Sequence, residues 1–235
     1  MKIIMNQNNH DSKTTEIVKK FNFMSKDGSE NYEVNIIEIL GGVYSYYTWP
    51  CAKILAQFIF YMRRCIKNMN ILEIGAGTSL PGILAKKLGA NVILSDSALL
   101  NKSLNHIKRI CACNNLKPGV DIQVKGLTWG MIGNGLFDMS NDLDLIIGSD
   151  CLYDNFVFED VLSTISFLLD QNPKSTFICS YQLRSSDWTF ENLLRKWNLK
   201  CRNIDLEEVG KDAGIDMKDL MEGHVIYLLE FYRLS

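Results

Sequence analysis

Short apolar runs and longer amphipathic stretches alternate along the chain from about residue 70 onward. The predicted strands are 70–75, 91–96, 121–127, 143–150, 175–181, 201–206 and 224–233, and helical spacing appears at 79–88, 98–113, 157–170 and 185–197. Nearly continuous apolar strands that alternate with amphipathic helices are typical of a mostly parallel sheet covered on both faces. The pattern therefore predicts an α/β fold built on a seven-stranded sheet.

Both ends of the chain depart from this alternation. Residues 21–26 and 31–40 are predicted to form a short β-hairpin, and a helix over 52–62 follows with Thr48 as its cap. Residues 1–20 are polar and Asn-rich, which predicts a flexible tail before a single domain over 21–235. Residues 207–223 show no convincing amphipathic helix, so the last strand is predicted to run antiparallel beside the fifth and sixth strands.

Composition and charge narrow the class of protein. The 235 residues are 47% hydrophobic and carry a net charge of −2, which suits one globular domain and gives no bulk positive field for nucleic acid. No apolar run approaches the roughly 20 residues of a membrane span. The seven scattered cysteines include no CxxC pair, so reduced thiols and no metal site are predicted. We expect an intracellular protein that binds neither nucleic acid directly nor membrane.

A glycine turn separates the first predicted strand of the sheet from its helix, in ILEIGAGTSLPGILAKKLGANVILSDS at 71–97. Ligands of open parallel sheets bind at the carboxyl ends of the strands. Gly75 and Gly77 let the backbone approach such a ligand closely, because they carry no Cβ. Asp96 ends the next strand, where its carboxylate can accept both ribose hydroxyl protons. The residues predict an adenosine cofactor.

Two residues distinguish between adenosine cofactors. The dinucleotide fingerprint has Gly or Ala at its sixth position, where this chain has Leu80, and Glu73 would face a pyrophosphate unfavourably. A cofactor with a sulfonium and an amino-acid tail suits Glu73 better, so S-adenosylmethionine is favoured over NAD. A tight turn that binds nothing is the remaining alternative.

The same motifs resemble a known family. EIGAGT at 73–78, Asp96, LTWG at 127–130 and SDCLYD at 149–154 are similar to the seven-strand S-adenosylmethionine-dependent methyltransferases, and within them to the methyltransferase-16 branch. The similarity runs from about residue 33 to 232 and includes YTWPCAKILAQF and YQLRSSDW. The resemblance implies a Rossmann-like methyltransferase sheet with an antiparallel last strand, and S-adenosyl-L-methionine as the cofactor.

The resemblance also implies where the cofactor is held. The glycine turn would pass under it, Glu73 would lie near its amino-acid end, and Asp96 would bind the ribose. Trp129 would pack at the adenine and Trp49 would close the pocket from the N-terminal side, although each tryptophan is also explained as a core aromatic. The implied cofactor-binding residues are Trp49, Glu73, Gly75, Ala76, Gly77, Asp96 and Trp129.

Three residues after the fourth strand are candidates for the methyl-accepting side. Asp150 ends a buried strand at the same sheet edge as the glycine turn, and Tyr153 could form a wall of the target channel. Glu159 lies nine positions after Asp150, a spacing that resembles the paired carboxylates of double-glutamate arginine methyltransferases. The alternative for Glu159 is an ordinary acidic residue in the first turn of a helix. Tyr181, Arg184 and Asp187 are weaker candidates for the same rim.

The resemblance favours a protein methyltransferase acting on side-chain nitrogen. Most relatives of this branch methylate lysine, whereas the subgroup this chain resembles most is associated with arginine in histone H3 and with nuclear and cytoplasmic locations. The protein substrate is therefore expected to be histone H3, with lysine in another protein as the alternative. A base methyltransferase is disfavoured because the post-strand motif D-C-L-Y lacks both prolines. A non-catalytic binding module with a chaperone or transcription-factor partner is the alternative from another class.

Overall fold

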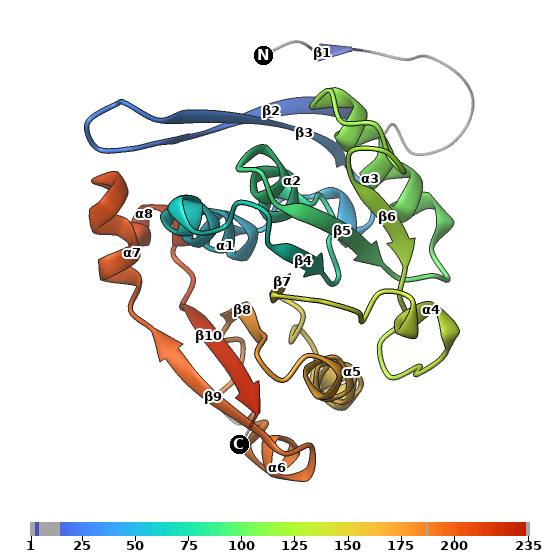
Figure 1. The fold of residues 1–235 in the computed structure, drawn as a ribbon. Coiled ribbons are helices and arrows are strands. Elements are labelled where there is room, and N and C mark those ends of the chain that lie inside the picture. Colours follow the sequence, from blue (N-terminus) through green and yellow to red (C-terminus); the bar gives the residue numbers. More distant parts are fainter. Residues whose placement is uncertain (1–2, 5–14, 187, 234–235) are drawn as a thin grey trace.

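The structure is a computed structural model that describes residues 3–4, 15–186 and 188–233 (Figure 1). Its centre is a seven-stranded sheet in the order β6-β5-β4-β7-β8-β10-β9. The strands are β4 (Asn70–Glu73), β5 (Asn91–Asp96), β6 (Gln123–Gly126), β7 (Leu145–Ser149), β8 (Thr176–Gln182), β9 (Leu199–Ile204) and β10 (Ile226–Arg233). The predicted α/β sheet is confirmed.

The last strand has the position and direction predicted from the sequence. β10 pairs antiparallel with both β8 and β9, whereas β4, β5, β6, β7 and β8 pair in parallel. Because these five strands run parallel, their carboxyl ends all lie at one edge of the sheet. We call this the carboxyl edge.

Helices cover both faces of the sheet (Figure 1). The helices are α1 (Pro50–Tyr61), α2 (Leu80–Lys87), α3 (Asn101–Cys113), α4 (Asn134–Phe137), α5 (Phe158–Gln171), α6 (Glu191–Lys196), α7 (Leu206–Ala213) and α8 (Met217–Met221), with short 3-10 turns at Tyr44–Tyr46, Met62–Arg64 and Asn155–Val157. Successive residues of β7 point to opposite faces: Ile147 packs with α1 and α2, and Ile146 packs with α5. Both faces are buried, which explains why the strands are continuous apolar runs.

A small second sheet lies outside the α2 and α3 layer. It pairs β1 (Ile3–Ile4), β2 (Thr15–Met24) and β3 (Asn31–Leu40) in antiparallel order. The Asn114 side chain at the end of α3 exchanges two hydrogen bonds with the backbone of Asn35, at 2.9 and 2.6 Å. This contact holds β3 against the helix layer.

Several element predictions need correction. Residues 15–20, assigned to the flexible tail, form the first part of β2, while residues 1–2 and 5–14 lie outside the described ranges. The 207–223 segment, where no amphipathic helix was expected, contains most of α7, which is amphipathic, and all of α8. Both are short, and Gly214 ends α7 in a left-handed conformation. A helix is predicted over 185–197, whereas α6 spans only Glu191–Lys196. Within the described ranges, no helix is long and apolar enough to cross a membrane.

Candidate active site

The glycine turn after β4 uses backbone conformations that side chains resist. Gly75 has a φ of 57° and Gly77 a φ of 50°, both in the left-handed region. A Cβ on Gly75 would also stand 2.7 Å from Cζ2 of Trp129, which is far too close. At Gly77 the same atom would make an ordinary 3.4 Å contact with the carbonyl oxygen of Ser45. Gly75 is therefore required for space and conformation, and Gly77 for conformation.

Asp96 joins the end of β5 to this turn. Its carboxylate accepts hydrogen bonds from the backbone N–H groups of Gly77 at 2.9 Å and Ser97 at 2.7 Å. The Ala76 N–H donates to the Ser95 carbonyl at 2.9 Å, which holds the same two segments together. Burial raises the pKa of Asp96, and the two N–H donors oppose that rise. A carboxylate has about four lone-pair sites, so it keeps the capacity to accept two ribose hydroxyls.

Glu73 lies beneath the turn and not on the surface of the cleft. The side chain is fully buried, and one carboxylate oxygen accepts the backbone N–H of Gly82 in α2 at 3.0 Å. The other oxygen, Oε1, has no hydrogen-bond partner among the described residues. Burial raises the pKa of Glu73 to about 8. This geometry makes Glu73 a support of the turn and of the start of α2, in contrast to the cofactor-facing position expected from the sequence.

Two tryptophans are expected at the glycine turn from the sequence, and the structure places one of them against it. Trp129, in the loop after β6, is half-buried between Gly75 and the ring of Tyr153, whose centroid is 6.4 Å away. Trp49 is the residue before α1, and its Nε1 donates to the carbonyl of Tyr44 at 3.0 Å. Trp129 therefore borders the turn, whereas the contacts of the Trp49 ring are with Tyr44 and Tyr47.

The Trp49 segment is attached directly to the turn. The hydroxyl of Thr48 donates to the hydroxyl of Thr78 at 3.2 Å, and the Ser45 carbonyl lies over Gly77. Thr48 therefore does not cap α1 through its side chain, and Trp49 is the N-cap residue with Pro50 in the first turn. The sequence carries no sign of Ser45 or Thr78, because no periodic pattern predicts that Thr78 contacts Thr48, 30 residues away, or that the Ser45 carbonyl lies over Gly77.

Asp150 immediately follows β7 at the carboxyl edge. It has a φ of 55°, in the left-handed region that is unfavourable for a residue with a Cβ, and its N–H donates to the Ser180 carbonyl at 2.8 Å. Its carboxylate pairs with both terminal nitrogens of Arg184, one of them at 2.8 Å. Tyr153 is 47% exposed, and burial of the rest of the ring raises the pKa of its phenol. Tyr153 thus lies beside Trp129 near the glycine turn, and Asp150 lies at the end of β7 on the same sheet edge.

The structure gives Asp150 and Glu159 different cationic partners. Glu159 lies in the first turn of α5 and forms an exposed ion pair with Lys196 of α6. This is the helix-start position that the sequence offered as the alternative to a paired-carboxylate site. Tyr181 is buried against Phe190, so it does not line the surface near Asp150 as the sequence suggested. Asp187 lies outside the described residues.

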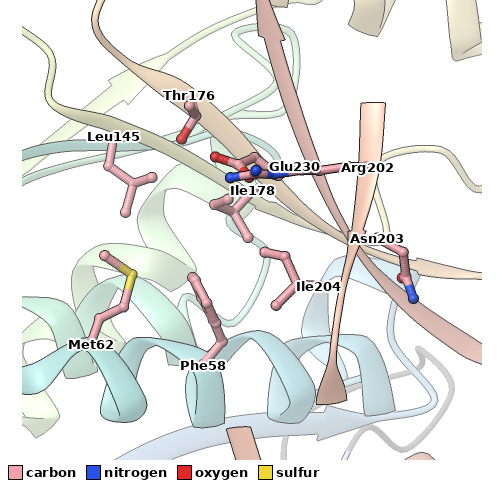
Figure 2. Close-up of a pocket in the computed structure, with 9 residues that line it drawn as sticks. All are labelled: Phe58, Met62, Leu145, Thr176, Ile178, Arg202, Asn203, Ile204 and Glu230. Carbon is pink, nitrogen blue, oxygen red and sulfur yellow. The ribbon is translucent and has the colours of Figure 1, made fainter. Parts of the chain in front are cut away.

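A cavity of 410 Å³ lies away from these residues. Figure 2 shows Phe58 of α1 and Met62 of the following 3-10 turn facing side chains of the sheet across it. Among these are Leu145 and Thr176, the first residues of β7 and β8. Its lining comprises Phe58, Met62, Leu145, Thr176, Ile178, Arg202, Asn203, Ile204 and Glu230. Parallel strands enter the sheet here and leave it at the carboxyl edge, so the cavity is separate from the candidate active site.

Comparison with known proteins identifies relatives of the same organisation. Residues 29–197 match the Methyltransf_16 family model, described as lysine methyltransferase. Histone-arginine methyltransferase METTL23 of Xenopus laevis is 44% identical over 82% of this chain and 81% of its own length. The Homo sapiens protein of the same name is 48% identical over 78% of this chain and 95% of its own. The crystal structure of magnesium protoporphyrin IX methyltransferase from Synechocystis PCC 6803 with bound SAM is 15% identical, covers 79% of this chain and 80% of its own, and superimposes with a TM-score of 0.53, which shows the shared fold.

Proposed function

The chain belongs to the Methyltransf_16 family of methyltransferases, and on that premise we propose that it transfers a methyl group from S-adenosylmethionine to arginine in histone H3. The arginine assignment rests on its 44–48% identity to proteins named histone-arginine methyltransferases. The observation that best supports the site is the hydrogen bond from the Gly77 N–H to Asp96, because it holds a carboxylate beside a turn whose glycines allow a ligand to approach closely. The proposal includes a nuclear pool of the protein beside a cytoplasmic one.

The residues present fit S-adenosylmethionine. The turn has two glycines in left-handed conformations, a carboxylate with free acceptor sites and the ring of Trp129 against Gly75. Asp96 would hold the ribose, the 75–77 backbone would lie under the cofactor, and Trp129 and Trp49 would enclose it. When bound, the cofactor supplies a methyl carbon activated by its sulfonium for direct displacement.

The protein's own contribution is positioning and exclusion of water. Trp129 lies against Gly75, and Trp49 would cover the cofactor from the N-terminal segment. Excluding water in this way would strengthen the polar contacts inside the site. Asp150 can accept hydrogen bonds from the nitrogens of a target guanidinium, which draws its positive charge away from the nitrogen that attacks. Tyr153 forms one side of the approach. Holding nucleophile and methyl in line accounts for much of the rate enhancement of such a displacement.

Lysine is the second candidate target, because the family as a whole is described as lysine methyltransferase. An amine must lose its proton before it attacks, and its reference pKa is about 10.4. Since Arg184 already neutralises the Asp150 carboxylate, the site has little negative charge to retain a protonated amine. The amine that binds beside Asp150 would therefore be the neutral form, which is the form that attacks the methyl group.

Transfer of radiolabel from S-adenosylmethionine to recombinant histone H3 tests the proposal, with the modified residue located by mass spectrometry. Label on arginine supports the proposal, and label on lysine alone supports the second candidate. Cofactor binding without transfer to histones or to cell extract would indicate a different substrate. Absence of cofactor binding at ~1 mM would point to a non-catalytic binding module.

A further inference from the structure

We propose that Arg184 is an internal competitor of the substrate: its guanidinium occupies the carboxylate of Asp150 and must leave it before a target arginine binds there. The inference rests on the proposed function and extends it to a residue that determines substrate affinity. In the structure, Asp150 already binds a guanidinium, that of Arg184, and a guanidinium is also the reactive group of an arginine substrate.

The ion pair has the geometry of a bound substrate guanidinium. Nη1 of Arg184 donates to Oδ1 of Asp150 at 2.8 Å and Nη2 donates to Oδ2, so the planar fork matches both carboxylate oxygens. Nη1 also donates weakly to the Gln182 carbonyl at 3.3 Å. The Asp150 side chain is only 10% exposed in this arrangement. A second guanidinium cannot form the same two-point contact while Arg184 remains in place.

The two members of the pair are held very differently. The backbone of Asp150 is fixed by its hydrogen bond to Ser180, and its left-handed conformation sets the direction of the carboxylate. Arg184 follows the last residue of β8 by two positions and lies outside any helix or strand. Its side chain is long and 27% exposed, so the guanidinium can be hydrated when it leaves. The carboxylate is the fixed partner and Arg184 the exchangeable one.

A lysine target would feel this competition less. A neutral amine neither repels the Arg184 guanidinium nor needs both carboxylate oxygens, because it is a single donor group. An arginine target stays charged and competes for both oxygens. Removing the Arg184 guanidinium should therefore favour arginine substrates selectively.

The test compares Arg184→Gln with wild type on two histone H3 peptides that differ only in carrying Arg or Lys at the modified position. The apparent affinity of a ligand falls with the fraction of protein that is competent to bind, so we expect KM for the arginine peptide to fall about three- to tenfold. We expect kcat to stay within about twofold, because the group removed makes no transition-state contact. KM for the lysine peptide should fall less, because an ammonium is a point charge that does not match both carboxylate oxygens as a guanidinium fork does, and affinity for S-adenosylhomocysteine should not change.

Arg202→Gln is the matched control. Arg202 forms an ion pair with Glu230 beside the 410 Å³ cavity, so this variant removes the same charge and the same kind of pair away from the carboxyl edge. It should leave every constant unchanged. An unchanged or higher KM in Arg184→Gln with a lower kcat would overturn the proposal, because Arg184 would then hold Asp150 in position for the reaction. An equal fall in KM for both peptides would also overturn it, since it would indicate only a general charge effect.

A binding experiment separates failure of this inference from failure of the proposed function. If wild type modifies no histone peptide, the proposed function fails, and methylguanidine titrated into the cofactor-analogue complex still probes the Asp150 site. Tighter binding of methylguanidine to Arg184→Gln than to wild type would support competition by Arg184. Equal or weaker binding would refute it.

Discussion

The ring of Trp129 covers the position that a side chain on Gly75 would occupy, with Cζ2 2.7 Å from an ideal Cβ. Gly75→Ala should therefore displace Trp129 in addition to straining a backbone at φ 57°. The strain alone costs roughly 1–2 kcal/mol, and we expect a larger loss of unfolding free energy because the ring must also move. Chemical denaturation measures the loss, and thermal shift with S-adenosylhomocysteine should show little stabilisation of the variant.

Gly119→Ala is the control for this experiment. Gly119 has a φ of 83° but open space around its Cβ position, so only the strain applies. It should lose about 1–2 kcal/mol and keep full stabilisation by the cofactor analogue. If the analogue stabilises Gly75→Ala as much as Gly119→Ala, the ligand does not lie on this turn.

The buried carboxyl group of Glu73 predicts a pH dependence of stability. Glu73 keeps its proton up to about pH 8 in the folded chain, against an ordinary value of 4.5. Unfolding between these values releases a proton, so stability falls as pH rises from about 4.5 to about 8, by up to about 1.4 kcal/mol per pH unit from this group. Glu73→Gln cannot ionise and should flatten the decline. Melting curves from pH 5 to pH 9 check this, and parallel pH profiles of the two proteins would contradict it.

Asp150 and Glu159 should differ sharply in their effect on methyl transfer. Asp150→Asn removes the charge at the carboxyl edge and should lower kcat/KM for histone H3 by at least about tenfold, the worth of a charge-assisted hydrogen bond. Glu159→Gln disrupts only an exposed ion pair with Lys196, which typically contributes less than about 1 kcal/mol, and should stay within about twofold of wild type. A tenfold loss in Glu159→Gln would restore the paired-carboxylate interpretation.

The sequence predicted the sheet well because its central strands β4, β5, β7 and β8 are largely buried and form nearly continuous apolar runs. It placed β10 between β8 and β9 from the absence of a long crossover helix, although α7 and α8 were missed as two short pieces. It placed Asp96 and Asp150 at one edge because both end parallel strands. Contacts between distant segments, such as Arg184 on Asp150 or Ser45 over Gly77, follow from loop conformations that no periodic pattern records.

The position of Glu73 marks the same limit at the candidate site. The motif showed that Glu73 precedes the glycine turn. The direction of its side chain depends on the conformation of the turn, and in the structure the carboxylate accepts the N–H of Gly82 at the start of α2. The resemblance implied Trp49 and Trp129 as cofactor-binding residues. The structure places the Trp129 ring against Gly75, and it attaches the residue before Trp49 to the turn through the Thr48–Thr78 hydrogen bond.

The central claim is that the carboxyl edge binds S-adenosylmethionine through Asp96, and calorimetric titration of the cofactor into wild type and Asp96→Ala tests it most directly. Loss of charge-assisted hydrogen bonds worth about 1.5–3 kcal/mol should weaken binding about ten- to a hundredfold. The variant should be shown to be folded under the conditions of the titration, because Asp96 also accepts the Gly77 N–H. Equal affinity of a folded Asp96→Ala and wild type would contradict the assignment of the cofactor site.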